Sequence, residues 1–160
     1  MPGMSGVVIT NGAPVAGSVG GPPRIARVAT QFDKTNNTLA NVTGLTFTLG
    51  VGTHKFEAVL FVTAPVGGCS FAVAGTVTAS AVVYDGLSIS EDATNQTKLR
   101  YTALGSSITG LIDPVVLTVI RGTITVSVAG TLTIQFAQTT SDVTASSVLV
   151  GSTLEVQAIS

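Results

Sequence analysis

Apolar and polar residues alternate strictly along residues 122–136, which read GTITVSVAGTLTIQF. Successive side chains of a β-strand point to opposite faces, so a period of two predicts strands with one buried face. A three-residue loop at residues 128–130 would pair Val126 with Leu132, apolar against apolar. A two-residue loop would oppose apolar to polar side chains instead. We therefore expect a β-hairpin with the longer loop.

The glycines of this hairpin have expected roles. Gly130 falls where a type I turn followed by a bulge needs a left-handed residue. We accordingly expect Gly130→Asn to be better tolerated than Gly130→Val, because Asn adopts that conformation more readily. Phe136 would lie opposite Gly122, where a large ring covers a residue without a side chain.

Further short β-prone runs follow one another along the chain, separated by turn residues. We expect strands at residues 24–32, 38–49, 54–63, 70–74, 77–84, 98–103, 115–121, 123–128, 131–137 and 147–159. Many short strands with regular turns are typical of a β-sandwich or barrel. The polar stretches 88–97 and 105–114 are expected to be exposed loops.

Charged residues are scarce. The 160 residues include 7 Lys and Arg and 8 Asp and Glu, with a net charge of −1, whereas about a quarter of a globular chain is typically charged. No basic run attracts nucleic acid or an anionic membrane. Obligate subunit interfaces resemble a protein core, so the low charge favours an oligomer.

Residues 58–84 contain no charged residue at all. The run is long enough to cross a bilayer, but Pro65, Gly67 and Gly68 interrupt it, so strands with turns are the better interpretation. Residues 58–62 are apolar at every position, which indicates a strand covered on both faces. We expect a subunit interface that includes Phe56, Ala58, Leu60, Phe61 and Val62.

The first residues differ from the rest in composition. They are rich in Gly, Pro and Ser, and no charge precedes Arg24. Residues 1–28 are expected to be an extended N-terminal arm, and residues 29–160 a single head domain. The arm is either a disordered tail or an anchor that orders against a partner, and we favour the anchor. Its β-prone run, suited to adding a strand to a neighbouring sheet, is Val7, Val8 and Ile9.

Few residues are candidates for catalysis or metal binding. His54 is expected to be a surface residue of a strand, and Cys69 a small buried thiol. Asp85, Glu91 and Asp92 share one region, but their spacing matches no calcium-binding loop of the EF-hand type. We therefore expect no enzymatic activity, no cofactor and no metal site.

Several strand sequences together resemble jelly-roll domains of bacteriophage virion proteins over residues 36–160. They are LANVTGL, GTHKFEAVLFV, GTITV, GTLTIQFAQ and SSVLVGSTL. The resemblance implies an all-β jelly-roll β-sandwich, a TNF/C1q-like trimer head, behind the extended N-terminal arm. It also implies a homotrimer located in the virion. No signal-peptide pattern opens the sequence, so synthesis in the host cytoplasm is expected.

Three functions are compatible with this resemblance. The preferred one is a trimeric capsid decoration protein or short head fibre, held on a capsid or other virion protein by its arm. The alternative is a tail-tip or baseplate module that binds a host glycan or protein through Tyr84, Arg100 and Tyr101. A small jelly-roll coat protein is a second alternative, although the basic arm that often packages RNA is missing.

Overall fold

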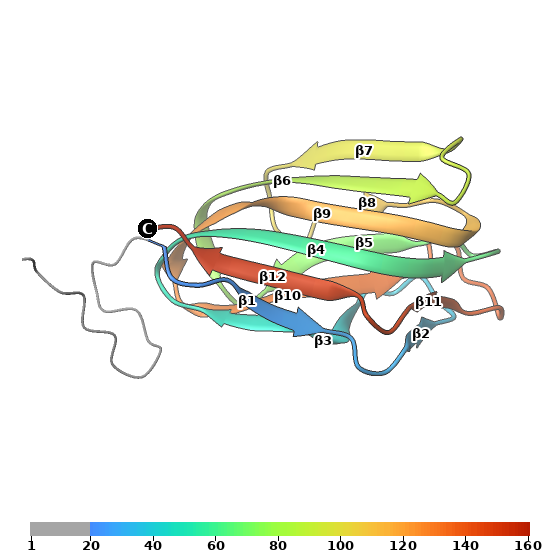
Figure 1. Ribbon diagram of the computed structural model, residues 1–160. Helices are drawn as coiled ribbons and strands as arrows, with labels where there is room; N and C mark the ends of the chain where they lie inside the picture. Colours follow the sequence, from blue (N-terminus) through green and yellow to red (C-terminus); the bar gives the residue numbers. More distant parts are fainter. Residues whose placement is uncertain (1–19) are drawn as a thin grey trace, which may run out of the picture.

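The computed structural model describes residues 20–160, which form twelve β-strands and no helix. The strands are β1 (Arg24–Arg27), β2 (Phe32–Lys34), β3 (Ala40–Leu49), β4 (Gly52–Ala64), β5 (Ser70–Gly75), β6 (Thr78–Ser90), β7 (Gln96–Tyr101), β8 (Ile108–Thr109), β9 (Asp113–Val128), β10 (Gly130–Ala137), β11 (Ser146–Val148) and β12 (Thr153–Ala158). Two antiparallel sheets pack face to face (Figure 1). The expected all-β sandwich is confirmed.

The connectivity of eight strands is that of a jelly roll. The larger sheet has the order β1-β12-β4-β9-β6-β7, and the smaller sheet has the order β3-β10-β5-β8. Leaving out β2, β6, β7 and β11, the first remaining strand pairs with the eighth, the second with the seventh, the third with the sixth and the fourth with the fifth. This nested pairing results when one long antiparallel pair rolls into two sheets.

The other four strands enlarge the larger sheet. β6 pairs with β9, and β7 pairs with β6, so together they extend this sheet beyond the jelly roll. The short strands β2 and β11 pair with each other, and β11 also pairs with the end of β4. The larger sheet is therefore wider than the smaller one that covers its inner face (Figure 1).

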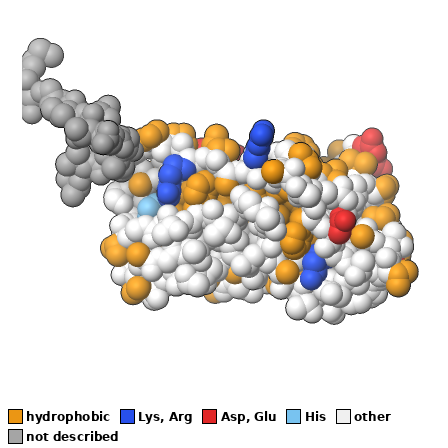
Figure 2. All heavy atoms as spheres, turned by 90° about the horizontal axis from the view of Figure 1, so that it is seen from below, with side chains coloured by type: hydrophobic (Ala, Val, Ile, Leu, Met, Phe, Trp, Pro, Cys, Tyr) orange, Lys and Arg blue, Asp and Glu red, His pale blue; other side chains and the backbone are white. Residues whose placement is uncertain are grey.

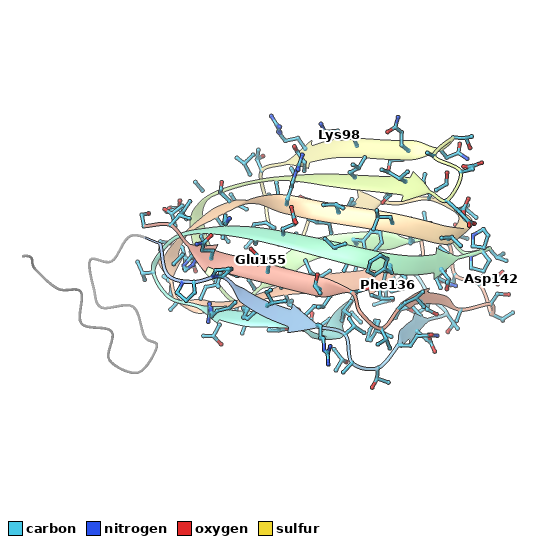
Figure 3. All side chains as sticks on the ribbon, in the orientation of Figure 1. Lys98, Phe136, Asp142 and Glu155 are labelled. Carbon is cyan, nitrogen blue, oxygen red and sulfur yellow. The ribbon has the colours of Figure 1, made fainter. Side chains whose placement is uncertain are left out.

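Alternate residues of the long strands fill the space between the sheets. In β10, Leu132, Ile134 and Phe136 are fully buried, and Figure 3 shows Phe136 between the sheets. The Phe136 ring lies 5.4 Å from that of Phe71 and meets Phe32 edge-on at 6.5 Å, measured between centroids. Burying each such side chain stabilises the fold by about 1.5–3 kcal/mol.

The expected hairpin over residues 122–136 is wrong. β9 pairs with β4 and β6 in the larger sheet, whereas β10 pairs with β3 and β5 in the smaller one. The chain therefore crosses between sheets at Ala129. Gly130 is not among the glycines with positive φ. A Cβ there would lie 2.7 Å from both Thr76 C and Val77 N, so the residue is small because another strand end approaches it closely.

Several strand limits also differ from expectation. β9 runs without a break through Gly122, where two strands were expected. β6 continues to Ser90, and β8 lies within the segment expected to be a loop at residues 105–114. The expected strand at residues 147–159 is divided into β11 and β12 by a turn.

The sandwich begins earlier than residue 29. β1 pairs with β12 along its whole length, and Val28, whose N–H donates to the Ser152 carbonyl oxygen at 2.8 Å, is fully buried. The boundary expected after residue 28 is therefore placed too late. The remainder of the expected arm, with Val7, Val8 and Ile9, lies outside the described residues.

Gly122 does lie beneath aromatic rings, but not beneath Phe136. It pairs with Phe56 on β4 and with Tyr84 on β6, and the two ring centroids lie 6.1 Å apart. A Cβ on Gly122 would meet the Val83 carbonyl oxygen and the Cβ of Tyr84. The glycine thus allows two buried rings to approach each other across the central strand.

We expect Gly122→Ala to reduce the free energy of unfolding by about 1–3 kcal/mol, because the added methyl overpacks the contact with β6. The matched control is Gly50→Ala, since a Cβ at Gly50 has no heavy atom within 4 Å. Chemical denaturation of both variants measures the difference. Equal stability of the two variants would contradict the close approach at Gly122.

Candidate functional site

The outer face of the larger sheet carries a row of charged side chains. The strand registers align one charged residue on each of five neighbouring strands, in the order Glu155, Glu57, Arg121, Asp85 and Arg100. We call these residues the charged row. Reading across β12, β4, β9, β6 and β7, the signs are negative, negative, positive, negative and positive.

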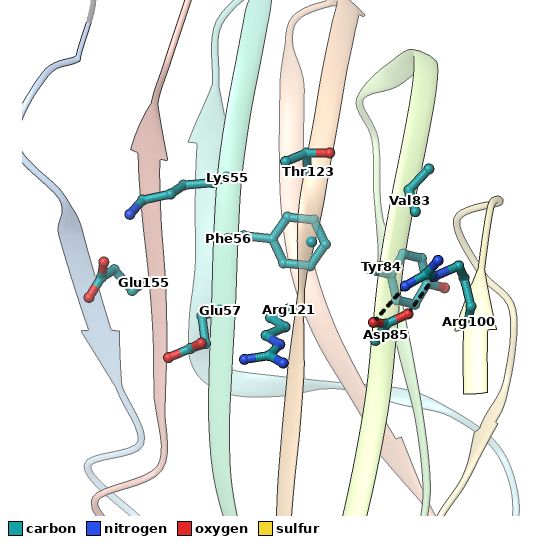
Figure 4. Close-up of a pocket in the computed structure, with 11 residues that line it drawn as sticks. Lys55, Phe56, Glu57, Val83, Tyr84, Asp85, Arg100, Arg121, Thr123 and Glu155 are labelled. Carbon is teal, nitrogen blue, oxygen red and sulfur yellow. Dashed lines mark hydrogen bonds and ion pairs between the residues drawn. The ribbon is translucent and has the colours of Figure 1, made fainter. Parts of the chain in front are cut away.

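A shallow hollow of about 420 Å³ lies along this row (Figure 4). Long side chains border it, whereas Val83 and Thr123 are short. The lining also includes Lys55 and three residues of the neighbouring row, which faces the core: Phe56, Tyr84 and Gly122. Charges of both signs line the hollow.

One ion pair is formed within the row. Arg100 Nε donates to Asp85 Oδ1 at 2.8 Å, and Arg100 Nη2 donates to Asp85 Oδ2 at 3.1 Å. These hydrogen bonds, helped by the positive charges of Arg100, Lys98 and Arg121, lower the pKa of Asp85. The side chain of Arg100 remains 68% exposed, so it is available for a further contact.

The residues expected to bind a receptor do not form one loop. Tyr84 lies on β6 and Tyr101 on β7, directly opposite each other, with their rings stacked at 5.3 Å. Tyr84 is 1% exposed and donates to the Ala103 carbonyl oxygen at 3.0 Å. Its burial raises the pKa of this phenol to about 12. Only Arg100 of the three points outward, so stacking of Tyr84 on a sugar is excluded by its burial.

Two apolar rows adjoin the charged row on the same face. One contains Phe61, Leu117 and Ile89, and the other contains Val59, Val119 and Leu87, in each case on β4, β9 and β6. We call these six residues the apolar rows. Of the residues expected at a subunit interface, Phe56, Ala58, Leu60 and Val62 instead fill the core of the sandwich, whereas Phe61 is 47% exposed.

His54 is buried, so its expected surface position is wrong. The side chain is 6% exposed because it shares the inward parity of Phe56 and Ala58 on β4. Its Nε2 lies 3.0 Å from the Gly50 carbonyl oxygen, and Nδ1 has no hydrogen-bond partner among the described residues. Cys69 is fully buried as expected, and burial raises the pKa of its thiol to about 12.

The acidic residues expected to share one loop are separated by the structure. Asp85 lies within β6, whereas Glu91 and Asp92 occupy the turn after it. Asp92 Oδ1 accepts hydrogen bonds from the Ser90 hydroxyl at 2.7 Å, the Thr94 N–H at 3.0 Å and the Thr94 hydroxyl at 2.7 Å. Residues 20–160 contain no group of three or more His, Cys, Asp or Glu placed to hold a metal. They also contain no helix long and apolar enough to cross a membrane.

The hydrogen bonds from Ser90 and Thr94 lower the pKa of Asp92 to about 2. A depressed pKa stabilises the fold fully above the ordinary value of 3.8, and the stabilisation is lost as the pH falls toward 2. We therefore expect Asp92→Asn to lower the melting temperature at pH 6 but not at pH 2. Glu91→Gln is the control, and a constant difference between Asp92→Asn and the parent protein at all pH values would contradict this role.

The outer face of the smaller sheet is polar but uncharged. The four strands β3, β5, β8 and β10 contain no Asp, Glu, Lys or Arg. Register places small hydroxyl and amide side chains side by side on this face, and we call them the threonine face: Asn41, Thr46, Thr48, Thr131, Thr133 and Gln135. Figure 2 shows a different side of the molecule, the one at the bottom of Figure 1, where a few charged side chains lie among apolar and uncharged ones.

The hydroxyl and amide groups of the threonine face bond largely to one another. Thr46 Oγ1 lies 2.8 Å from Thr133 Oγ1, and Gln135 Nε2 donates to Asn41 Oδ1 at 2.9 Å. Thr133 Oγ1 also donates to the Leu45 carbonyl oxygen at 3.0 Å. Four of the six side chains are thus paired within the face, and Thr131 Oγ1 lies 3.1 Å from Thr76 Oγ1.

Sequence reasoning singled out Arg100 and Asp85 but missed Glu57, Arg121, Glu155 and the threonine face. The alternation of Glu57 with the apolar residues around it was visible in the sequence. What the sequence did not contain was the register that aligns residues from five strands.

Comparison with known proteins identifies no family. No protein-family model and no curated protein matches the chain. A structure of infectious bursal disease virus Gt strain is similar at a TM-score of 0.24 and 12% identity, covering 98% of this chain and 42% of that one. A structure of the Gx strain gives 0.21 and 13%, covering 86% and 36%. This chain thus spans less than half the length of either, and these TM-scores are too low to bear on its function.

Proposed function

We propose that the protein is a structural component of a virus particle, of the bacteriophage kind, that assembles as a homotrimer. The jelly-roll connectivity and the sequence resemblance to phage head domains both support this role. The observation that carries the proposal of self-assembly is the uncharged threonine face. In this proposal the chain performs no catalysis.

The threonine face suits a subunit interface for an energetic reason. Charged residues are depleted at the centres of interfaces, because removing them from water is costly. Here no strand of the smaller sheet carries a charge. The paired side chains Thr46 and Thr133 keep their mutual hydrogen bond when water leaves. Covering this face with another subunit therefore has a small desolvation cost.

Within the particle, we assign the chain to a capsid decoration protein or short head fibre. The trimer would project outward, and the N-terminal residues would hold it on a capsid or other virion protein. The apolar run Val7, Val8 and Ile9 is the proposed anchor. The receptor-binding alternative loses support, because Tyr84 is in the core.

Light scattering on the purified chain should give three times the 16.0 kDa subunit mass, or a multiple of that value. Thr48→Lys places a charge on the threonine face, so we expect it to reduce the mass to a third. Thr35→Lys adds the same charge to an exposed turn after β2 and should leave the mass unchanged. A monomer at micromolar concentration in the parent protein would overturn the trimer.

Deleting residues 2–19 tests the anchor while keeping the whole described fold. We expect the truncated chain to retain its mass and melting temperature but to be lost from purified virus particles assembled without the full-length protein. The measurement is the amount of the chain per particle after density-gradient purification. Undiminished incorporation would place the anchor in the head.

A further inference from the structure

The outer face formed by β4, β9, β6 and β7 remains exposed to solvent although it is partly apolar. Phe61 is 47% exposed, Leu117 38% and Val83 44%. The charged row crosses the same four strands beside the two apolar rows. An exposed face with this combination is typical of an interaction site.

We propose that this face binds a second copy of the chain about a two-fold axis that is parallel to the strands and lies between β9 and β6. Such an axis places β9 of one copy on β6 of the other, and β4 on β7. In the charged row, Arg121 then meets Asp85 of the second copy, and Glu57 meets its Arg100. Each contact occurs twice, because the interface uses the same patch on both subunits.

The same axis also brings the central members of the apolar rows together. It places Val119 on Leu87 of the second copy and Leu117 on its Ile89, so apolar side chains meet at the centre of the interface. Toward the edge, Phe61 lies near the amide of Gln96, and Val59 lies near the aliphatic stem of Lys98. The β6–β7 pairing sets the positions of Gln96 and Lys98 in the two rows. The apolar contacts supply buried area, and the charges mainly set orientation and specificity.

Other two-fold arrangements of this face are disfavoured by charge. An axis along β9 would place Arg121 on Arg121 of the second copy and Glu57 on its Asp85. An axis along β6 would place Asp85 on Asp85 of the second copy and Arg121 on its Arg100. An axis between β4 and β9 would match Glu57 with Arg121 but oppose Glu155 to Asp85. An axis across the strands, along the charged row, would place every charged residue on the equivalent residue of the second copy, so like charges would meet.

The hollow provides room for the long side chains of such a contact. Packed sheets lie about 10 Å apart, and two layers of Arg and Glu side chains need space between them. The hollow of about 420 Å³ lies beside Arg121 and Arg100 in each copy. Asp85 already accepts two hydrogen bonds from its own Arg100, so Arg121 of the second copy would complete a charged network around it.

The two-fold contact is separate from the proposed trimer, because it uses the opposite sheet. If both contacts form, each trimer can join further trimers, and light scattering at high concentration will give six subunits or a larger multiple of three. The two-fold contact alone gives two subunits, and the trimer alone gives three. The mass therefore distinguishes failure of this inference from failure of the proposed function.

Charge reversal tests the geometry. Glu57→Lys places a second cation opposite Arg100 of the other copy, and Arg100→Glu places a second carboxylate opposite its Glu57. Each variant alone should weaken two-fold association more than about tenfold, measured as Kd by sedimentation equilibrium. Mixing the two variants makes both contacts opposite in charge again, so the mixture should recover the two-fold association.

Glu91→Lys is the matched control, since it adds the same charge in the turn after β6 without facing a cation in the proposed contact. It should neither weaken association nor restore it when mixed with Arg100→Glu. Circular dichroism verifies that each variant keeps its β-structure. The inference is overturned if the parent protein forms neither a dimer nor an assembly larger than a trimer at 100 micromolar or below, or if the mixture of Glu57→Lys and Arg100→Glu fails to associate.

Discussion

β9 is the strand on which the organisation of the larger sheet depends, because it is hydrogen-bonded to β4 on one side and to β6 on the other along most of its length. A slip of one residue would turn Arg121 toward the core and Ile120 toward solvent. The two aromatic rings packed over Gly122 oppose such a slip, since only glycine fits between them. The same register that builds the core therefore also aligns the charges outside it.

Period two predicted which side of β9 and β10 faces the core, but not which strand is the neighbour of each. A chain that crosses from one sheet of a sandwich to the other keeps its apolar residues inward, just as a hairpin does. The pattern in residues 122–136 was therefore equally compatible with both, and the jelly roll uses the crossing. For the same reason, the expectation that a large ring covers Gly122 was chemically right and its assigned partner, Phe136, was wrong.

Some errors were avoidable and others were not. His54 shares the parity of Phe56, Ala58 and Leu60, so its burial could have been predicted from the strand alone. The charged row could not, because it needs the registers of β12, β4, β9, β6 and β7 together, and β12 and β7 are more than fifty residues apart in the chain. The threonine face could not be predicted either, because it depends on the register between β3 and β10, which are far apart in the chain.

The uncharged composition of the smaller sheet has a consequence for how the protein responds to its surroundings. Dissolved salt screens charges and does little to contacts between paired hydroxyls. An assembly built on the threonine face would thus respond little to ionic strength, whereas a contact through the charged row of the opposite face would weaken as salt is added. The two faces of one small sandwich would then differ in kind: the smaller sheet would form a contact that persists at high salt, and the larger sheet one that dissociates as the salt concentration rises.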